Sequence, residues 1–325
     1  MDQGGDINQA TKNITNLHQI YQGVFLNLDR SIDRKCYLNA HLEQIGLQEY
    51  FTKYQAFDTD THLFHSHPST NITDTEKACY STHIQAMQDY CTHNKHLHIV
   101  EDDVEMHSDT GKILHHLFCE NNFNDFDIIF TGVSFWNTSR QILEANILNT
   151  KQDYTLFSLN RDLFFSGLYS YIIHKDKIEK IATLCKEHQF QFSIDLLIRN
   201  LIISNQLKAY CILPTIAMPS FLFPSTIDNT QTNRYQLEGI AGHSFNNDYA
   251  KLLHRLFFRG ESFQSIYGDF IAFFERNNAV MPKISNQATI HNLFLIMSKN
   301  HLLNRKGASE ILSLYPAPIK VIKIT

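Results

Sequence analysis

The chain has 325 residues, of which 43% are hydrophobic and 19% charged, and its formal net charge is -5 at pH 7. This length suits one large α/β domain, or one domain with a smaller appendage, around a sizeable buried core. The composition excludes the disordered and membrane-embedded classes, and the acidic balance argues against a nucleic-acid partner, which requires a basic face.

The first twenty residues form a polar leader without the apolar core of a signal peptide. No window reaches the roughly 18 apolar residues that span a bilayer, so we expect a cytoplasmic protein without a transmembrane segment. Six cysteines lie far apart without a C-x-x-C pair, which favours free thiols. Eighteen histidines show no fixed ligand spacing, which favours solvated or packed histidines over a metal cage.

The first regular elements form the opening of a βα unit. Residues 23–28 (GVFLNL) are rich in strand-forming residues, and residues 31–47 carry apolar side chains at helical spacing. Ser31 is a plausible N-cap of this helix, and Gly46 stands where a C-terminal cap belongs. A strand, a turn and a helix therefore follow one another within about 25 residues.

The same alternation continues to about residue 213. It predicts a strand within 50–60 that ends at Asp58, a helix at 75–93, strands at 97–100, 126–132 and 167–174, helices at 175–188 and 194–205, and a strand at 208–213. Such alternation is typical of an α/β fold with a mostly parallel sheet covered by helices.

The composition changes between residues 230 and 240. The later segments YAKLLHRLFFR, SIYGDFIAFFER and IHNLFLIMSKN show amphipathic helical patterns without a convincing strand between them. We therefore divide the chain into a leader (1–20), an α/β domain (21–232) and a mainly helical C-terminal region (233–325). Basic and aromatic residues in KLLHRLFFR would allow peripheral membrane contact, although helical spacing more often marks a core face.

A short apolar strand, Leu97 to Val100, runs directly into three acids, Glu101, Asp102 and Asp103. In a doubly wound sheet, ligands bind beyond the carboxyl ends of the strands. Adjacent carboxylates repel one another there unless a cation neutralises them, and Mg²⁺ or Mn²⁺ prefers such oxygen ligands together with substrate phosphates. The triplet alone fits two interpretations equally well: a divalent-metal site, or a solvated turn whose acids cap the next helix.

Three segments resemble the glycosyltransferase family 25 domain, which includes bacterial lipopolysaccharide galactosyltransferases and collagen galactosyltransferases. VFLNLDRSIDR (24–34), EKACYSTHIQAMQ (76–88) and HIVEDDVEM (98–106) resemble its N-L-D-R-x-x-x-R, G-E-x-x-C-x-x-S-H and E-D-D motifs, in order. Four shorter segments are also similar to motifs of this family: QAFDTD, SGLYSYII, SIDLLI and PSFLFPSTI. The resemblance therefore covers roughly residues 22–228.

Three positions depart from the family pattern, and the C-terminal region has no matching motif. Thr75 stands where the family usually has Gly, Thr82 where it has Ser, and Ser193 where Pro is common. These changes concern loop geometry and leave the acceptor pocket undefined.

The resemblance implies a GT-A-type fold, a Rossmann-like α/β domain that binds a nucleotide sugar. It also implies inversion at the anomeric carbon, with a UDP-sugar such as UDP-galactose or UDP-glucose as the simplest donor and a glycan or protein hydroxyl as acceptor. By position, Asp102 and Asp103 correspond to the site for Mn²⁺ (or Mg²⁺) and the diphosphate, with Glu101 supporting them or contacting the donor. Asp103 is the first choice as direct ligand.

Four residues after the first strand are candidate donor contacts. By the resemblance, Asn27, Asp29 and Arg30 would hold the base and ribose, and Arg34, one helical turn after Arg30, would reach a phosphate. The alternative for Arg34 is a surface arginine that pairs with a neighbour such as Asp33.

Three further donor contacts have structural alternatives. Asp58 resembles a ribose or base contact, although an Asx-turn acid fits nearly as well. His83 would contact the donor, or it would simply pack in the core. Glu76 would contact the donor, or it would be an acid at a helix start that the helix dipole stabilises.

An inverting transfer needs a general base on the acceptor hydroxyl. Asp195 opens the helix SIDLLIRNL and is the best candidate, while the alternative is that Ser193 or Asp195 itself is the N-cap. Two other functions stay open: a catalytically silent protein that binds a nucleotide sugar or a partner, and a different divalent-metal enzyme, such as a phosphotransferase or nucleotidyltransferase.

Overall fold

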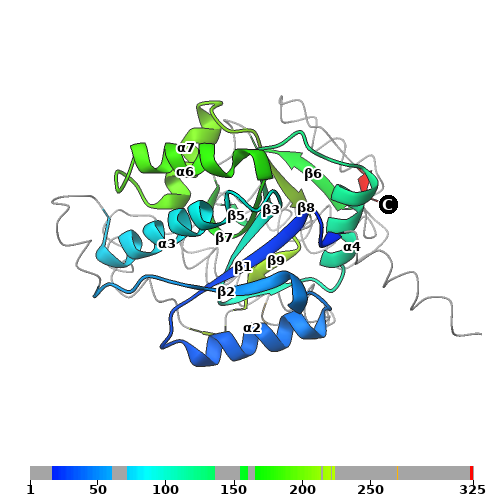
Figure 1. The fold of residues 1–325 in the computed structure, drawn as a ribbon, viewed down its shortest axis with the longest axis horizontal. Helices are drawn as coiled ribbons and strands as arrows, with labels where there is room; N and C mark the ends of the chain where they lie inside the picture. Colours follow the sequence, from blue (N-terminus) through cyan, green and yellow to red (C-terminus); the bar gives the residue numbers. More distant parts are fainter. Residues whose placement is uncertain are drawn as a thin grey trace, which may run out of the picture.

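The computed structural model describes residues 17–60, 72–135, 154–159, 165–213, 215–220 and 222–223, together with 269 and 323–324. These residues form a mixed α/β fold around an eight-stranded sheet of order β10-β6-β8-β5-β7-β3-β1-β2 (Figure 1). A second sheet has two strands, β4 and β9. Within the described residues, no helix is long and apolar enough to cross a membrane.

The elements follow the chain in this order: β1 (Tyr21–Asn27), α2 (Ile32–Gln44), η1 (Gln48–Tyr50), β2 (Phe51–Gln55), α3 (Asp74–Tyr90), β3 (His96–Glu101), β4 (Val104–Met106), α4 (Thr110–His115), η2 (His116–Glu120), β5 (Ile128–Phe135), β6 (Tyr154–Ser158), β7 (Phe165–Ile173), η3 (Lys175–Lys177), α6 (Ile178–Glu187), α7 (Ile194–Ile203), β8 (Ala209–Leu213), β9 (Ala217–Pro219) and β10 (Lys323–Ile324).

Six strands of the large sheet run in the same direction. The pairs β1–β2, β1–β3 and β5–β8 are parallel, while β7 is antiparallel to both β3 and β5, and β6 is antiparallel to both β8 and β10. The predicted α/β class with a mostly parallel, helix-covered sheet is therefore confirmed. The reversed β7 was not predicted, and it brings its first residues to the edge where β1, β2 and β3 end.

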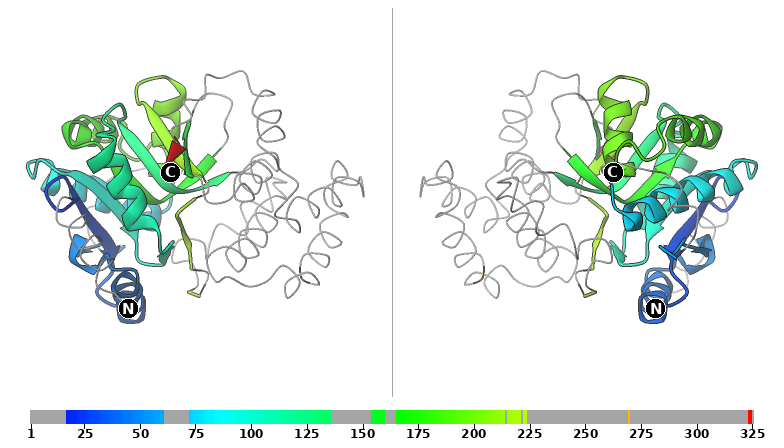
Figure 2. Two further views of the ribbon diagram at one scale, coloured as in Figure 1. Left: turned by 90° about the vertical axis from the view of Figure 1, so that its right-hand side faces the viewer. Right: turned by 90° about the vertical axis from the view of Figure 1, so that its left-hand side faces the viewer.

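Alternating side chains divide the core into one layer on each face of the sheet. Val24 and Leu26 belong to the layer under α3, α6 and α7, whereas Phe25 between them belongs to the layer under α2 and α4. In Figures 1 and 2 the blue helix α2 accordingly lies across the sheet from the green helices α6 and α7. Both layers bury apolar surface, which is the main favourable contribution to folding.

Helix α2, which lies beside the acid triplet, has a well-defined C-terminal end. Beyond α2, Gly46 adopts φ +71°, and the amides of Gly46 and Leu47 donate to the carbonyls of Glu43 (3.1 Å) and Leu42 (2.8 Å). This is a Schellman motif, and it confirms Gly46 as the C-terminal cap. Ser31 precedes α2 as predicted, although its side chain makes no capping hydrogen bond.

Several elements differ from the sequence prediction. The second strand ends at Gln55, so Asp58 lies in the following loop. Strands β4, β6 and β9 and helix α4 were not predicted, and within the predicted helical C-terminal region the described residues 323–324 form the edge strand β10. Most of the predicted leader (1–20) and nearly all of the C-terminal region (233–325) lie outside the described residues.

Gly132 in β5 is expected to be indispensable for packing. A Cβ there would lie 2.3 Å from the carbonyl oxygen of Ala217 and 2.5 Å from the Tyr169 ring, and a backbone atom cannot rotate away. Gly132→Ala should therefore lower the free energy of unfolding by about 1–3 kcal/mol in urea denaturation. The matched control is Gly111→Ala in α4, where the new Cβ meets only Leu47 at 3.4 Å; equal destabilisation of both variants would contradict the expectation.

Candidate active site

The carboxyl ends of β1, β2 and β3 meet at one edge of the sheet, beside the first residues of β7. A cavity of about 120 Å³ opens there. Its walls include seven of the predicted site residues: Arg30, Arg34, Asp58, His83, Glu101, Asp102 and Asp103. This is the position at which α/β sheets bind their ligands.

The alternation of β3 separates the acids of the triplet. Leu97 and Ile99 belong to the core layer under α3, so Glu101, two residues further on, faces that helix. Asp102 faces the opposite side, toward α2, where it meets Arg34. Consecutive carboxylates thus have different neighbours.

Asp102 is a fully engaged carboxylate. Arg34 Nη1 donates to its Oδ1 at 2.7 Å, and Asn27 Nδ2 donates to its Oδ2 at 2.7 Å. Arg34 is only 9% exposed and its Nη1 lies 3.4 Å from Asp103 Oδ2. The alternative of a surface arginine paired with Asp33 is therefore wrong: Arg34 is a buried cation that holds the acid triplet.

The triplet carries more negative charge than Arg34 neutralises. Burial, and then the charges of Asp103, Asp102 and Asp195, raise the pKa of Glu101 to about 8, although Arg34 opposes this shift. Burial also raises the pKa of Asp103 against the opposing effect of Arg34. Burial is the largest cause of both shifts, and buried carboxyl groups with raised pKa values beside a cavity are candidates for function.

The donor atoms of the triplet fit a hard divalent cation. They are carboxylate oxygens, the ligands that Mn²⁺ and Mg²⁺ accept, and they face a cavity. Asp102 already accepts hydrogen bonds on both oxygens, while the Asp103 side chain is twice as exposed, at 20% against 10%. This difference favours Asp103 as the direct ligand, with Asp102 beside it.

The residues around Arg30 separate into a cavity wall and an outer surface. Arg30 forms an ion pair with Asp58 at the wall, and Asp58 Oδ1 also accepts from the Thr59 amide at 2.7 Å. Asp58 therefore lies at the cavity, as predicted, and its side chain also bonds the next backbone amide, as the alternative of a local turn requires. Asp29 is not among the lining residues: its side chain is 76% exposed and pairs with Lys53 on β2.

Helix α3 presents one predicted residue as a cap and one as a cavity wall. Glu76 accepts from the Thr73 amide at 2.6 Å and completes a capping box, which supports its structural alternative. His83 is wholly buried, with Nδ1 2.8 Å from the Tyr171 hydroxyl. Burial lowers the pKa of His83 to about 3, so its imidazole is neutral.

Asp195 is held rigidly at the start of α7. Its Oδ1 accepts from Ser193 Oγ at 2.7 Å and from the Leu196 amide at 2.9 Å, and its Oδ2 accepts from the Gly167 amide at 3.1 Å. Gly167 has φ +84°, a conformation that other residues rarely adopt. Ser193 occupies the N-cap position but its side chain bonds Asp195 instead of capping the helix.

Three residues absent from the predicted site also belong to it. Cys79 lines the cavity, and Thr82 Oγ1 accepts from the Phe57 amide at 2.9 Å, which holds the loop after β2 against α3. The Ser220 amide donates to the carbonyl of Asp103 at 2.6 Å. The spacing of Cys79 and His83, four residues apart on a helix, is a signal that the sequence contained; no local pattern indicated Ser220.

The comparison with known families gives one match. The model of glycosyltransferase family 25, described as an LPS biosynthesis protein family, matches residues 22–198, more than half of the chain. This range includes all of the predicted site residues. No curated protein matches the chain significantly.

Arg34→Met should strongly destabilise the fold, because it leaves Asp102 and Asp103 without their buried cation. Breaking a buried ion pair in this way typically costs about 3–5 kcal/mol. Arg30→Met is the matched control, since the Arg30 side chain is 59% exposed and its pair with Asp58 should contribute less than about 1 kcal/mol. Urea denaturation at pH 7 checks both values, and similar losses in the two variants would contradict this role for Arg34.

Glu101→Gln should stabilise the protein at alkaline pH. The folded-state pKa of about 8 lies above the usual value of 4.5, so the folded state binds the proton more tightly. Stability should therefore fall as pH rises from about 4.5 to about 8, by at most ~1.4 kcal/mol per pH unit for one proton. Thermal unfolding in EDTA should show a shallower decline for Glu101→Gln than for wild type, whereas Glu43→Gln, an exposed acid on α2, should leave the slope unchanged.

Proposed function

Because the chain belongs to glycosyltransferase family 25, we propose that it is a metal-dependent inverting enzyme that transfers galactose or glucose from a UDP-sugar to a hydroxyl of a glycan or protein. The family supports a glycosyltransferase with a sugar donor and an acceptor as its substrates. The observation that carries the finer proposal is the triplet of Glu101, Asp102 and Asp103, which faces a cavity with Arg34 as its partial counter-charge.

In this proposal the triplet holds the diphosphate end of the donor. Asp103 and Asp102 would bind Mn²⁺ or Mg²⁺, and the bound cation would stabilise the charge that gathers on the departing diphosphate. Arg34 and Asn27 fix the orientation of Asp102, so that its carboxylate does not need to reorganise during the reaction. Arg30 and Asp58 on the cavity wall are the proposed contacts to the nucleoside.

Asp195 is the proposed general base. In the transfer, the acceptor oxygen forms a bond to the anomeric carbon, the bond to the diphosphate breaks, and UDP leaves with the electron pair. The hydroxyl proton passes to a carboxylate oxygen of Asp195. Ser193 and the Gly167 amide hold this carboxylate in one orientation.

Donor hydrolysis tests the proposal. The full chain is incubated with UDP-, GDP- and CMP-sugars in Mn²⁺ or in EDTA, and the free nucleotide is measured. We expect UDP release from UDP-galactose or UDP-glucose that requires the cation. Asp103→Asn should abolish it, because the cation and diphosphate lose their direct ligand, while Asp33→Asn on the exposed face of α2 should have no effect.

The base is tested separately from the donor site. Asp195→Asn should slow transfer to an added acceptor by about 10²–10⁴-fold and leave the Kd of the UDP-sugar unchanged. Equal loss of binding and turnover would contradict the role of Asp195. Tight binding of a nucleotide sugar without turnover on any acceptor would favour the catalytically silent alternative, and indifference to every nucleotide sugar would contradict both.

A further inference from the structure

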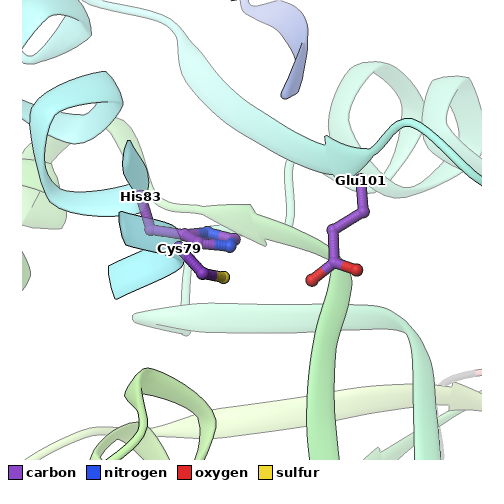
Figure 3. A group of neighbouring side chains, drawn as sticks. All are labelled: Cys79, His83 and Glu101. Carbon is purple, nitrogen blue, oxygen red and sulfur yellow. The ribbon is translucent and has the colours of Figure 1, made fainter. Parts of the chain in front are cut away.

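We propose that Cys79, His83 and Glu101 form a second cation site, which takes a thiolate-binding divalent cation such as Zn²⁺. One ligand atom from each residue lies within 4.8 Å of the other two. Figure 3 shows Cys79 and His83 on α3 pointing toward the carboxylate of Glu101, at the end of β3. This site is separate from the oxygen site proposed for Asp102 and Asp103.

The periodicities of α3 and β3, which lie next to each other, bring the three side chains together. Residues four apart on a helix lie on the same face, so Cys79 and His83 are neighbours on α3. The alternation of β3 turns Glu101 toward that helix and Asp102 away from it. The fold therefore presents the three ligands to one point from two adjacent elements.

The histidine offers an unused ligand atom. His83 Nδ1 is held by the Tyr171 hydroxyl at 2.8 Å, and His83 Nε2 is buried with no hydrogen-bond partner among the described residues. A buried polar atom without a partner costs free energy, which a bound cation would recover. In metal sites the second ring nitrogen of a ligating histidine is usually held by such a partner, which is the position of Tyr171.

Binding of a cation requires the Cys79 thiol to lose its proton. Burial raises the pKa of the Cys79 thiol, and the nearby charges of Glu101, Asp195 and Glu76 raise it further. On binding, the thiol proton and any proton on Glu101 would leave to solvent as the sulfur and oxygen coordinate the ion. A thiolate, an imidazole and a carboxylate are ligands of Zn²⁺, whereas Mn²⁺ and Mg²⁺ prefer oxygen.

The geometry requires only a small adjustment. A tetrahedral Zn²⁺ with ligands at about 2.0–2.3 Å keeps the ligand atoms about 3.5 Å apart, so the three groups need to approach by about 1 Å. Three protein ligands leave a fourth position, and all three residues line the cavity, so this position is open to water or to a ligand there.

Metal binding tests the site without reference to sugar transfer. The full chain is freed of metal with EDTA, and Zn²⁺ affinity is measured by competition with a chromophoric chelator. Co²⁺ in place of Zn²⁺ reports sulfur coordination through its thiolate charge-transfer absorption in the near ultraviolet. We expect one equivalent of Zn²⁺ per chain and a Co²⁺–thiolate band. Cys79→Ser should abolish the band, and His83→Gln should weaken Zn²⁺ binding at least ~10-fold.

Two further variants define the outcome. Cys91→Ser, at the end of the same helix, should keep both the affinity and the band, and Asp103→Asn should keep the band because Asp103 belongs to the oxygen site. Circular dichroism verifies that each variant is folded, and Cys79→Ala replaces Cys79→Ser if the serine variant is not, with the same expected loss of the band. Absence of Zn²⁺ binding in wild type, or a band that survives Cys79→Ser, would overturn the proposal. Because the readout is metal binding, the result tests the second cation site independently of the transferase proposal.

Discussion

A single buried guanidinium holds the acidic end of β3 in place. The period of two along the strand sends Asp102 toward α2 and Glu101 toward α3. Arg34 reaches Asp102 and Asp103 but leaves Glu101 with a pKa of about 8. Asp102 and Asp103 thus share one buried guanidinium at this edge of the sheet.

Several hydrogen-bonded groups lie around the acid triplet, on the sides away from the cavity. Asn27 fixes Asp102 from β1, the capping box positions the start of α3, and three hydrogen bonds hold Asp195 at the start of α7. These contacts come from segments far apart in the chain, which the carboxyl ends of parallel strands and the reversed β7 bring together. Functional groups on such fixed elements keep their geometry without reorganising when a ligand binds.

The sequence predicted what depends on local pattern. The strands β1, β2, β3, β5, β7 and β8, the helices α2, α3, α6 and α7, the Gly46 cap and the E-D-D strand end follow from periodicity or from contiguous motifs, and the family match over residues 22–198 covers most of them. Strands β4 and β6 and helix α4 carry no such pattern. Tertiary pairing was not predictable in this way. The Arg34–Asp102 ion pair, the direction of β7 and the pairing of β4 with β9 depend on which segments meet in space. A motif position also does not determine where a side chain points: Asp29 lies in the N-L-D-R motif, but its side chain faces outward.

The pairing of β4 with β9 also has a consequence for the order of events in folding. Strand β4 lies near the middle of the described range 17–223 and β9 near its end, and the Ser220 amide donates to the backbone carbonyl of Asp103. Contacts across such a long sequence separation form slowly, because the loop between them must be closed first. The acid triplet therefore acquires its last neighbour only when almost the whole domain has been synthesised and packed, so that a truncated or half-folded chain lacks a complete pocket.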